Sequence, residues 1–544
     1  MPWLVLPAVL TLLSSAFAAT LTTDRGVTEG MLLYHNDDFT VVADLKSDRN
    51  AVLFKAAEIK EIKADPLELK FARLRSEDVK LAPQLTADPD TLPPLRTLLK
   101  DEIPSWYGGT FGLDIQAEKI ERAEALIHGI LTTRRADLQK TWTEQLEKLQ
   151  LTPAQLRAIV REGYLAGFAH GKPGRWIVPF SIEQFPQEKM LCVISVPGDY
   201  TPEKRWPLIV WLHHTGPGDI DASSNYPAEV QQKYIILSPW AKAAHGWGPS
   251  RLGRASLWSA LDAIMARYRI DTSRMYVEGM SMGGVGARKN AIWAPDRFAA
   301  VCARSGPPLK QNIGELYANL HSLPMLALCG SADPLIPCEQ FKWERDMAAK
   351  LKLPVTVRIE EGGDHSEYRQ FDDEVYAFFA QNTRNAFPRR LTAVSYEDGT
   401  GLAHYYLEME PDNRGNSSIE TNVLSIVSAQ RSRERDSNAL LKAGADPKNI
   451  VDKVLMWMHP RRVTLEVDRD SNTMTVTRAE RVLKLRIYLD SDLVDMTKPV
   501  KVKIPGREAV IHVPRCRLEF MLDEARRRKR RDITYWDVIE VPLK

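Results

Sequence analysis

The segment RMYVEGMSMGG (residues 274–284) decides how the centre of this chain folds. A strand-like apolar run ends at Glu278, a glycine-rich turn follows, and a helix-like pattern extends from Val285 to Trp293. The turn contains Gly-x-Ser-x-Gly, a pattern that places a serine on a sharp turn between a strand and a helix. Its two glycines let neighbouring backbone pass without a Cβ clash. We therefore interpret Ser281 as a nucleophile held at the carboxyl end of a strand.

Strand-like and helix-like patterns alternate throughout residues 165–385. Helical patterns separate several apolar runs, for example Leu257 to Tyr268 and Gln340 to Leu351. Near-continuous apolar strands that alternate with helices indicate an α/β fold, with a mostly parallel sheet covered by helices on both faces. We expect its strands at residues 190–196, 207–212, 233–239, 273–279, 299–305, 324–330 and 354–360.

This central region resembles the α/β-hydrolase superfamily. It is most similar to secreted bacterial esterases of the feruloyl and acetyl-xylan type and to compact prolyl-oligopeptidase-related hydrolases. The resemblance implies a serine hydrolase that works through an acyl-enzyme. The matching pieces are RWPLIVWLHHTGPG (205–218), RIDTSRMYVEGMSMGG (269–284), LALCGSADPLIP (326–337) and EEGGDHSEY (360–368).

The resemblance implies a catalytic triad in the chain order Ser, Asp, His. Asp333 follows an apolar run 52 residues after Ser281, and His365 follows the next run, 32 residues further on. Asp364 is an alternative acid, but we favour Asp333, since a direct sequence neighbour would seldom reach the required ring nitrogen. In this triad His365 takes the serine proton and later protonates the leaving group, while Asp333 orients the imidazole.

The resemblance also implies an oxyanion hole made of two backbone N–H groups. One belongs to Met282, and we expect the other from Thr215, with His214 as the alternative. His214 stands where the family usually has glycine, so it is either a substrate contact or a loop histidine without a catalytic role. Trp240 and Trp247 are either substrate contacts at the rim of the cleft or ordinary packing residues.

Composition and the first residues limit the class of protein. The 544 residues include 73 Lys and Arg against 71 Asp and Glu, and this formal net charge of +2 argues against nucleic-acid binding. The apolar run Leu4 to Leu13 and the following Ala16-Phe17-Ala18 are typical of a secretory signal peptide, which we expect over residues 1–19. The alternative is a buried N-terminal strand or helix. We see no run long enough to span a bilayer and expect a secreted or periplasmic protein.

Two flanking domains are expected around the hydrolase domain. Residues 20–160 indicate a mixed, mostly helical domain, with alternating runs at 40–45 and 51–54 before helical patterns at 118–149. The first part of the chain contains no catalytic signature.

Residues 390–544 indicate a β-rich, sandwich-like accessory domain. Period-2 stretches are separated by hairpin-like turns at 470–472 and 505–506. Residues 518–522 fit a short amphipathic helix. The basic run Arg526 to Arg531 is either a solvated helix end or a contact for an anionic partner.

Cysteines and ligand motifs add little. We interpret the cysteines as buried free thiols. The alternative is a disulfide bond between Cys329 and Cys338. The sequence has no H-E-x-x-H, paired C-x-x-C, Walker A or G-x-G-x-x-G pattern, so no metal or cofactor is expected.

The sequence predicts a secreted serine hydrolase that cleaves carboxylic esters, with acetyl or aromatic esters on polysaccharides as the expected substrates. One alternative is a prolyl-oligopeptidase-related peptidase, although such enzymes typically carry a large β-propeller that residues before 165 do not resemble. The other is a binding protein built on a degenerate hydrolase scaffold. The sequence gives no indication of the oligomeric state.

Overall fold

The structure is a computed structural model of the whole chain. It describes residues 19–24, 26–44, 51–64, 66, 69, 72, 73, 76, 79–82, 115–163, 171–214, 226–241, 247, 251–309, 311–395, 403–411 and 460–543. The predicted signal peptide lies outside these residues except for Ala19, which is the first residue of strand β1. In the part of the chain that is described, no helix is both long and apolar enough to cross a bilayer.

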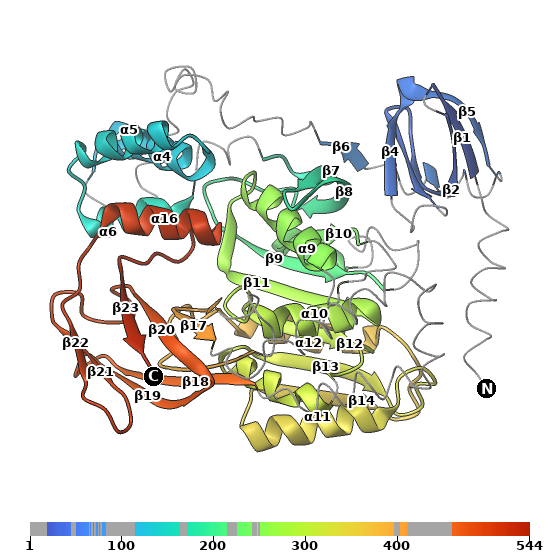
Figure 1. Cartoon of the computed structure of the whole chain (residues 1–544). Helices are drawn as coiled ribbons and strands as arrows, with labels where there is room; N and C mark the ends of the chain where they lie inside the picture. Colours follow the sequence, from blue (N-terminus) through green and yellow to red (C-terminus); the bar gives the residue numbers. More distant parts are fainter. Residues whose placement is uncertain are drawn as a thin grey trace, which may run out of the picture.

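A nine-stranded sheet forms the centre of the protein (Figure 1). Its strand order is β14-β13-β12-β11-β9-β10-β8-β7-β6. The strands from β14 to β10 in this order pair in parallel, whereas β8 is antiparallel to both of its neighbours. The strands are β6 (Val79–Leu81), β7 (Gly174–Ile182), β8 (Phe185–Val196), β9 (Trp206–Leu212), β10 (Ile235–Pro239), β11 (Ile270–Met280), β12 (Ala300–Arg304), β13 (Met325–Gly330) and β14 (Val355–Glu360). The predicted mostly parallel sheet and its seven predicted strands are confirmed.

Helices cover both faces of this sheet, which explains why its strands are apolar throughout. Alternate residues of β9 face opposite sides, so that Leu208 and Val210 join one core while Ile209 and Trp211 join the other. The first core is closed by α9 (Arg251–Met265), α10 (Met282–Trp293) and α11 (Cys338–Leu351). The second is closed by α8 (Ala228–Lys233) and α12 (Asp372–Gln381).

The region before the domain of the central sheet is mixed, as predicted, and helices α4, α5 and α6 lie in its second half. Its first part is a five-stranded antiparallel sheet with the order β4-β3-β2-β1-β5, so the two predicted alternating runs belong to a larger sheet. Leu33 and Phe39 of this sheet pack into the core of the central sheet, and β6 extends the central sheet itself. The elements are β1 (Ala19–Thr23), β2 (Gly26–His35), β3 (Phe39–Asp44), β4 (Ala51–Lys55), β5 (Ile59–Lys63), α4 (Ala117–Thr132), α5 (Ala136–Glu147) and α6 (Pro153–Glu162).

Two sheets enclose a separate core in the C-terminal region, so the predicted β-rich sandwich is confirmed. One sheet consists of β15 (Arg390–Ser395), β18 (Arg461–Asp468), β19 (Thr473–Glu480), β21 (Val500–Lys503) and β22 (Val510–His512). The other consists of β16 (Ala403–His404), β17 (Leu407–Pro411), β20 (Val482–Leu489) and β23 (Asp537–Pro542). Both predicted hairpin turns are present, with Asn472 and Gly506 in the left-handed region at φ 50° and 72°.

The predicted amphipathic helix is α16 (Leu518–Arg528), and it joins two distant parts of the sequence (Figure 1). Its buried Met521 and Leu522 pack with Ile120 and Ile127 of α4 and Ile159 of α6. Helices α4, α5 and α6 therefore share one core with the C-terminal region.

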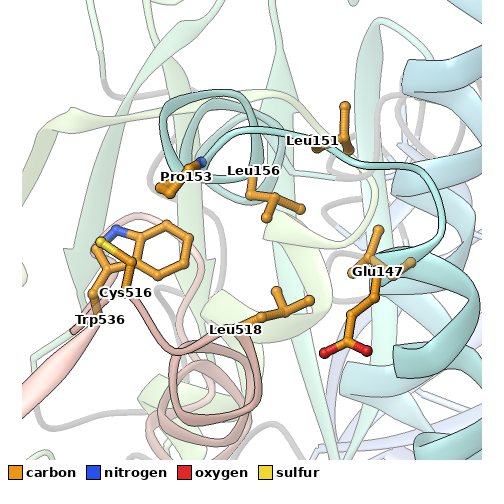
Figure 2. A pocket seen from close by; sticks show the side chains of 8 residues that line it. Glu147, Leu151, Pro153, Leu156, Cys516, Leu518 and Trp536 are labelled. Carbon is orange, nitrogen blue, oxygen red and sulfur yellow. The ribbon is translucent and has the colours of Figure 1, made fainter.

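A cavity of about 220 Å³ opens where α5 and α6 meet the chain around α16 (Figure 2). Leucine side chains surround it, and the Cys516 thiol and the Trp536 indole lie on one side of it. None of the predicted catalytic residues lines this cavity.

Part of the basic run at the end of α16 is used inside the molecule, while other members of it remain exposed. Arg530 is buried and pairs with Asp296, between α10 and β12, and with Asp532, which also pairs with Arg384. Burial alone would raise the pKa of Asp532, but the two guanidinium groups outweigh it and hold that pKa well below its usual range. These arginines join the C-terminal region to the domain of the central sheet.

We expect Arg530→Gln to lower the free energy of unfolding by about 3–5 kcal/mol, because it leaves buried Asp296 and Asp532 short of positive charge. Arg526→Gln is the matched control. Arg526 belongs to the same basic run but forms a solvent-exposed pair with Asp523, so its loss should cost less than about 1 kcal/mol. Urea unfolding measures both, and equal losses would contradict the buried role of Arg530.

The same ion pairs predict a pH dependence of stability. The folded-state pKa of Asp532 lies below its unfolded value, so its contribution is fully present above about pH 4 and is lost as the pH falls through the folded value. Arg530→Gln should therefore lose less stability than the wild type between pH 5 and acid pH, as thermal unfolding across that range would show.

Candidate active site

Ser281 occupies a strained turn between β11 and α10. Its backbone has φ 54° and ψ −113°, a conformation that costs energy for any residue with a side chain. Two hydrogen bonds hold it there: its N–H donates to the carbonyl of Arg304 at 2.8 Å, and its carbonyl accepts from the N–H of Val285 at 3.0 Å. The strand–turn–helix context predicted for Ser281 is therefore present.

Glycine is required on both sides of Ser281 because the turn folds against the end of β9. A Cβ atom on Gly283 would lie 1.7 Å from the carbonyl oxygen of Leu212, and one on Gly279 would lie 2.5 Å from the same oxygen. Both distances are far below van der Waals contact. The Gly-x-Ser-x-Gly spacing thus follows from the close approach of one neighbouring strand.

His365 and Asp333 form a hydrogen-bonded pair. The imidazole Nδ1 lies 2.8 Å from Asp333 Oδ2, and the other carboxylate oxygen accepts the backbone N–H groups of Leu335 and Ile336 at 2.8 and 2.9 Å. The Asp333 side chain is fully buried, whereas His365 is 15% exposed. Because Asp333 takes Nδ1, the Nε2 atom of His365 is left to exchange a proton with a substrate or a nucleophile.

Asp364, the alternative acid, is used differently. The hydroxyl of the buried Tyr368 donates to its backbone carbonyl, which helps to fix the loop that carries His365. Asp333, not Asp364, is the carboxylate bonded to the imidazole.

The three predicted triad residues follow strands that run in the same direction. Ser281 follows β11, Asp333 follows β13 and His365 follows β14, so all three lie at the carboxyl edge of the sheet. In open α/β sheets this edge is where ligands bind. The loop of His365 is also bonded directly to the strand beside β11, since Ser305 Oγ donates to the carbonyl of Ser366 at 2.6 Å.

The structure describes two of the three residues considered for the oxyanion hole, Met282 and His214. Met282 is the first residue of α10, so its N–H belongs to the positive end of that helix. Thr215 lies outside the described residues. His214 is half-buried, and its carbonyl oxygen lies 2.8 Å from Nδ1 of His213. Because His213 Nε2 accepts the N–H of Ala241, its Nδ1 carries the proton and donates to His214.

Trp240 and Trp247 support this loop from inside the protein rather than from an exposed rim. Their side chains are 2% and 0% exposed, and both rings pack against His213 at centroid distances of 5.2 and 5.1 Å. Trp247 also donates its indole N–H to the His213 carbonyl at 2.9 Å. They fix the backbone next to His214.

Sequence reasoning missed a buried ionic cluster under the nucleophile turn. Glu278 and Arg304 are fully buried and bonded to each other, on the adjacent strands β11 and β12. The available signal was a charged residue inside each of two otherwise apolar strands, MYVEG and AVCAR.

The described parts of the chain contain neither a metal-ligand cluster nor a disulfide bond. No group of three or more His, Cys, Asp or Glu side chains gathers there as a metal site would require. All five cysteines are free, including Cys329 and Cys338. Burial raises the pKa of Cys302 to about 12, which leaves it an inert core thiol.

No protein-family model matches the sequence, and no curated protein matches it. Among solved structures, a thermostable esterase is 19% identical, with 38% of this chain and 63% of the esterase covered and a TM-score of 0.33. The S-formylglutathione hydrolase of Agrobacterium tumefaciens is 17% identical, with 39% and 96% covered and a TM-score of 0.33. A ferulic acid esterase from Anaeromyces mucronatus is 16% identical, with 39% and 90% covered and a TM-score of 0.32.

The central domain has the α/β-hydrolase fold that the sequence predicts. That assignment follows from the chain's own features: the parallel strands at its centre, the helices on both faces and the glycine-bounded serine turn between β11 and α10.

We expect Gly283→Ala to destabilise the protein by at least about 1–3 kcal/mol, because the added methyl group would overlap the Leu212 carbonyl. Gly198→Ala is the matched control, since nothing lies within 4 Å of a Cβ atom at that position. Thermal unfolding compares the two variants. Equal midpoints would show that the turn does not depend on the close approach of β9.

Proposed function

We propose that this protein is a serine hydrolase that cleaves carboxylic esters through the triad Ser281, His365 and Asp333. One observation carries the proposal: a buried carboxylate holds Nδ1 of an accessible imidazole, at the same sheet edge as a serine in a strained, glycine-bounded turn. This combination supplies the groups that acyl transfer needs and has no evident structural role.

In the proposed reaction His365 Nε2 accepts the Ser281 hydroxyl proton as Oγ attacks the ester carbonyl carbon. The C–O bond to the alcohol then breaks, and the imidazolium returns the proton to the departing alkoxide. Water activated by the same imidazole hydrolyses the acyl-serine to the carboxylic acid and restores the free hydroxyl. Asp333 remains ionised throughout, and its bonds to Leu335 and Ile336 keep it aligned with the ring.

The developing oxyanion needs two N–H donors. Met282 N–H at the start of α10 is the first, and Thr215 N–H, or that of His214, is proposed as the second. The packing of His213 between two tryptophans supports this assignment, because it fixes the backbone that leads into the loop.

We propose acetyl or aromatic esters of polysaccharides as substrates and an exported location for the enzyme. The sequence resemblance and the signal-peptide pattern support these two steps. Leu335 adds an observation from the structure, because this apolar side chain is 47% exposed only two residues from Asp333. It would suit the apolar part of an ester.

We expect Ser281→Ala to lower the hydrolysis of p-nitrophenyl acetate by about 10⁵- to 10⁶-fold without loss of stability, because the nucleophile is removed. Ser471→Ala, in the hairpin turn between β18 and β19, is the control and should keep wild-type activity. A fluorophosphonate probe should label the wild type and not Ser281→Ala. Cleavage of a prolyl peptide alone would favour the peptidase alternative, and a folded wild type that neither cleaves nor labels would favour the scaffold alternative.

Asp333→Asn should lower kcat by about 10⁴-fold, because an amide NH₂ would face Nδ1 and impose the wrong tautomer. The variant should fold, since its amide oxygen can still accept the N–H groups of Leu335 and Ile336. Asp364→Asn is the matched control, because it leaves in place the backbone carbonyl that accepts the Tyr368 hydroxyl. Steady-state ester hydrolysis distinguishes the two acids, and a larger loss in Asp364→Asn would overturn the assignment of Asp333.

A further inference from the structure

The buried cluster around Arg304 has no part in the proposed chemistry. Arg304 is the last residue of β12 and is inaccessible to solvent. Its guanidinium group donates to Glu278 of β11 at 3.0 Å and to Asp372, the first residue of α12, at 2.7 Å. Three separate elements of the hydrolase domain therefore meet at one side chain.

The same residue contacts both halves of the proposed catalytic machinery. Its carbonyl oxygen accepts the N–H of Ser281 at 2.8 Å, and its Nη1 donates to the carbonyl of Glu367 at 2.9 Å. The next residue, Ser305, adds the 2.6 Å bond from Oγ to the carbonyl of Ser366. The two residues that follow His365 are thus held by two consecutive residues at the end of β12.

The groups that face Arg304 keep it charged and fixed. Tyr226 donates to the second oxygen of Glu278 at 2.7 Å, and Arg369 lies 3.5 Å from the second oxygen of Asp372. Burial alone would lower the pKa of Arg304, but Glu278 and Asp372 outweigh it and hold that pKa above its ordinary value. Arg304 is therefore held as a guanidinium cation, paired with both carboxylates.

Ser305 is held in a conformation that its own backbone does not favour. Its φ is 45°, in the left-handed region, and its N–H donates to the carbonyl of Leu328 on β13 at 2.8 Å. Strain of this kind persists only where the surroundings over-determine it. Here it turns the hydroxyl group toward the loop of His365.

We infer that Arg304 and Ser305 are positioning residues that fix the loop of His365 relative to the turn of Ser281. The effect of these residues on catalysis rests on the proposed function. The hydrogen bonds between the His365 loop and the end of β12 are a property of the fold. Catalytic groups must be held close to their productive geometry, and a displacement of about 1 Å can cost about 10²-fold in rate.

The decisive variant is Ser305→Ala, which removes one hydroxyl group and leaves the ionic cluster intact. We expect it to lower kcat by about 10- to 100-fold with little change in KM, since the loop and not the substrate is affected. Arg304→Gln should lower kcat at least as much. If Arg304→Gln does not fold, the result for Ser305→Ala alone tests the positioning role.

Arg269→Gln is the matched control for losing a buried arginine. Arg269 is also buried, and it donates to the carboxylate of Glu162 at 2.6 Å and to the carbonyls of Pro202 and Glu203 at 3.0 and 2.8 Å. It lies at the amino end of β11, the opposite end from Ser281. Its variant should lose thermal stability as Arg304→Gln does, but keep the wild-type kcat.

Hydrogen–deuterium exchange of the peptide that contains residues 364–368 supplies a readout independent of catalysis. Exchange should be faster in Ser305→Ala and Arg304→Gln than in the wild type, and unchanged in Arg269→Gln. The wild type could be inactive while exchange in residues 364–368 is still faster in Ser305→Ala. That result would overturn the proposed function and support the link between the His365 loop and the end of β12. Unchanged exchange, or a kcat in Ser305→Ala equal to that of the wild type, would overturn the positioning role.

Discussion

The carbonyl oxygen of Leu212 is the constraint on which the centre of the molecule depends. Strands β9 and β11 are parallel neighbours, with Leu212 opposite Gly279, so the chain that leaves β11 must turn directly over the end of β9. Only residues without a Cβ atom can make that turn at Gly279 and Gly283. The positive φ of Ser281 and the start of α10 one residue later follow from this single contact. A core packing requirement thus also presents a serine hydroxyl at the sheet edge.

Around this turn the protein places charges where strands of this kind normally carry apolar residues. Isolated charges inside the sheet would be costly to desolvate, and the cost is offset because each carboxylate meets a guanidinium group and each guanidinium group also meets backbone carbonyls. Arg288 of α10 and Glu344 of α11 form a second fully buried pair, between two helices rather than two strands. Buried clusters with this many directed bonds admit few alternative geometries, which suits the part of the fold where loop positions matter most.

The sequence predicted those features that depend on local periodicity or on backbone conformation. Seven strands of the central sheet, the first turns of the helix that begins at Leu518 and the hairpin turn at Asn472 were readable, because burial pattern and turn chemistry are encoded within a few residues. The two strands β6 and β7 of the same sheet were not predicted. The full extent of the N-terminal sheet was not readable, since β1 and β2 are rich in threonine and glycine and the second partner of β1 is β5, which follows β3 and β4 in the chain. The burial of Trp240 and Trp247 could not be predicted either, because it depends on both rings packing against His213. Likewise, nothing local reveals that Arg530 will meet Asp296.

That last contact changes how the C-terminal region relates to the rest of the chain. Asp296 and Pro295 come directly after α10, the helix that begins at the proposed nucleophile. Arg530 binds the carboxylate of Asp296, and the hydroxyl of buried Tyr405 donates to the carbonyl of Pro295 at 3.0 Å. Asn319 of the hydrolase domain adds a bond to the carbonyl of Val394 on β15. A tethered accessory domain would show few contacts of this kind. Because the far end of α10 is anchored by the sandwich and its near end by β9, the C-terminal region belongs to the framework that holds the serine turn in place.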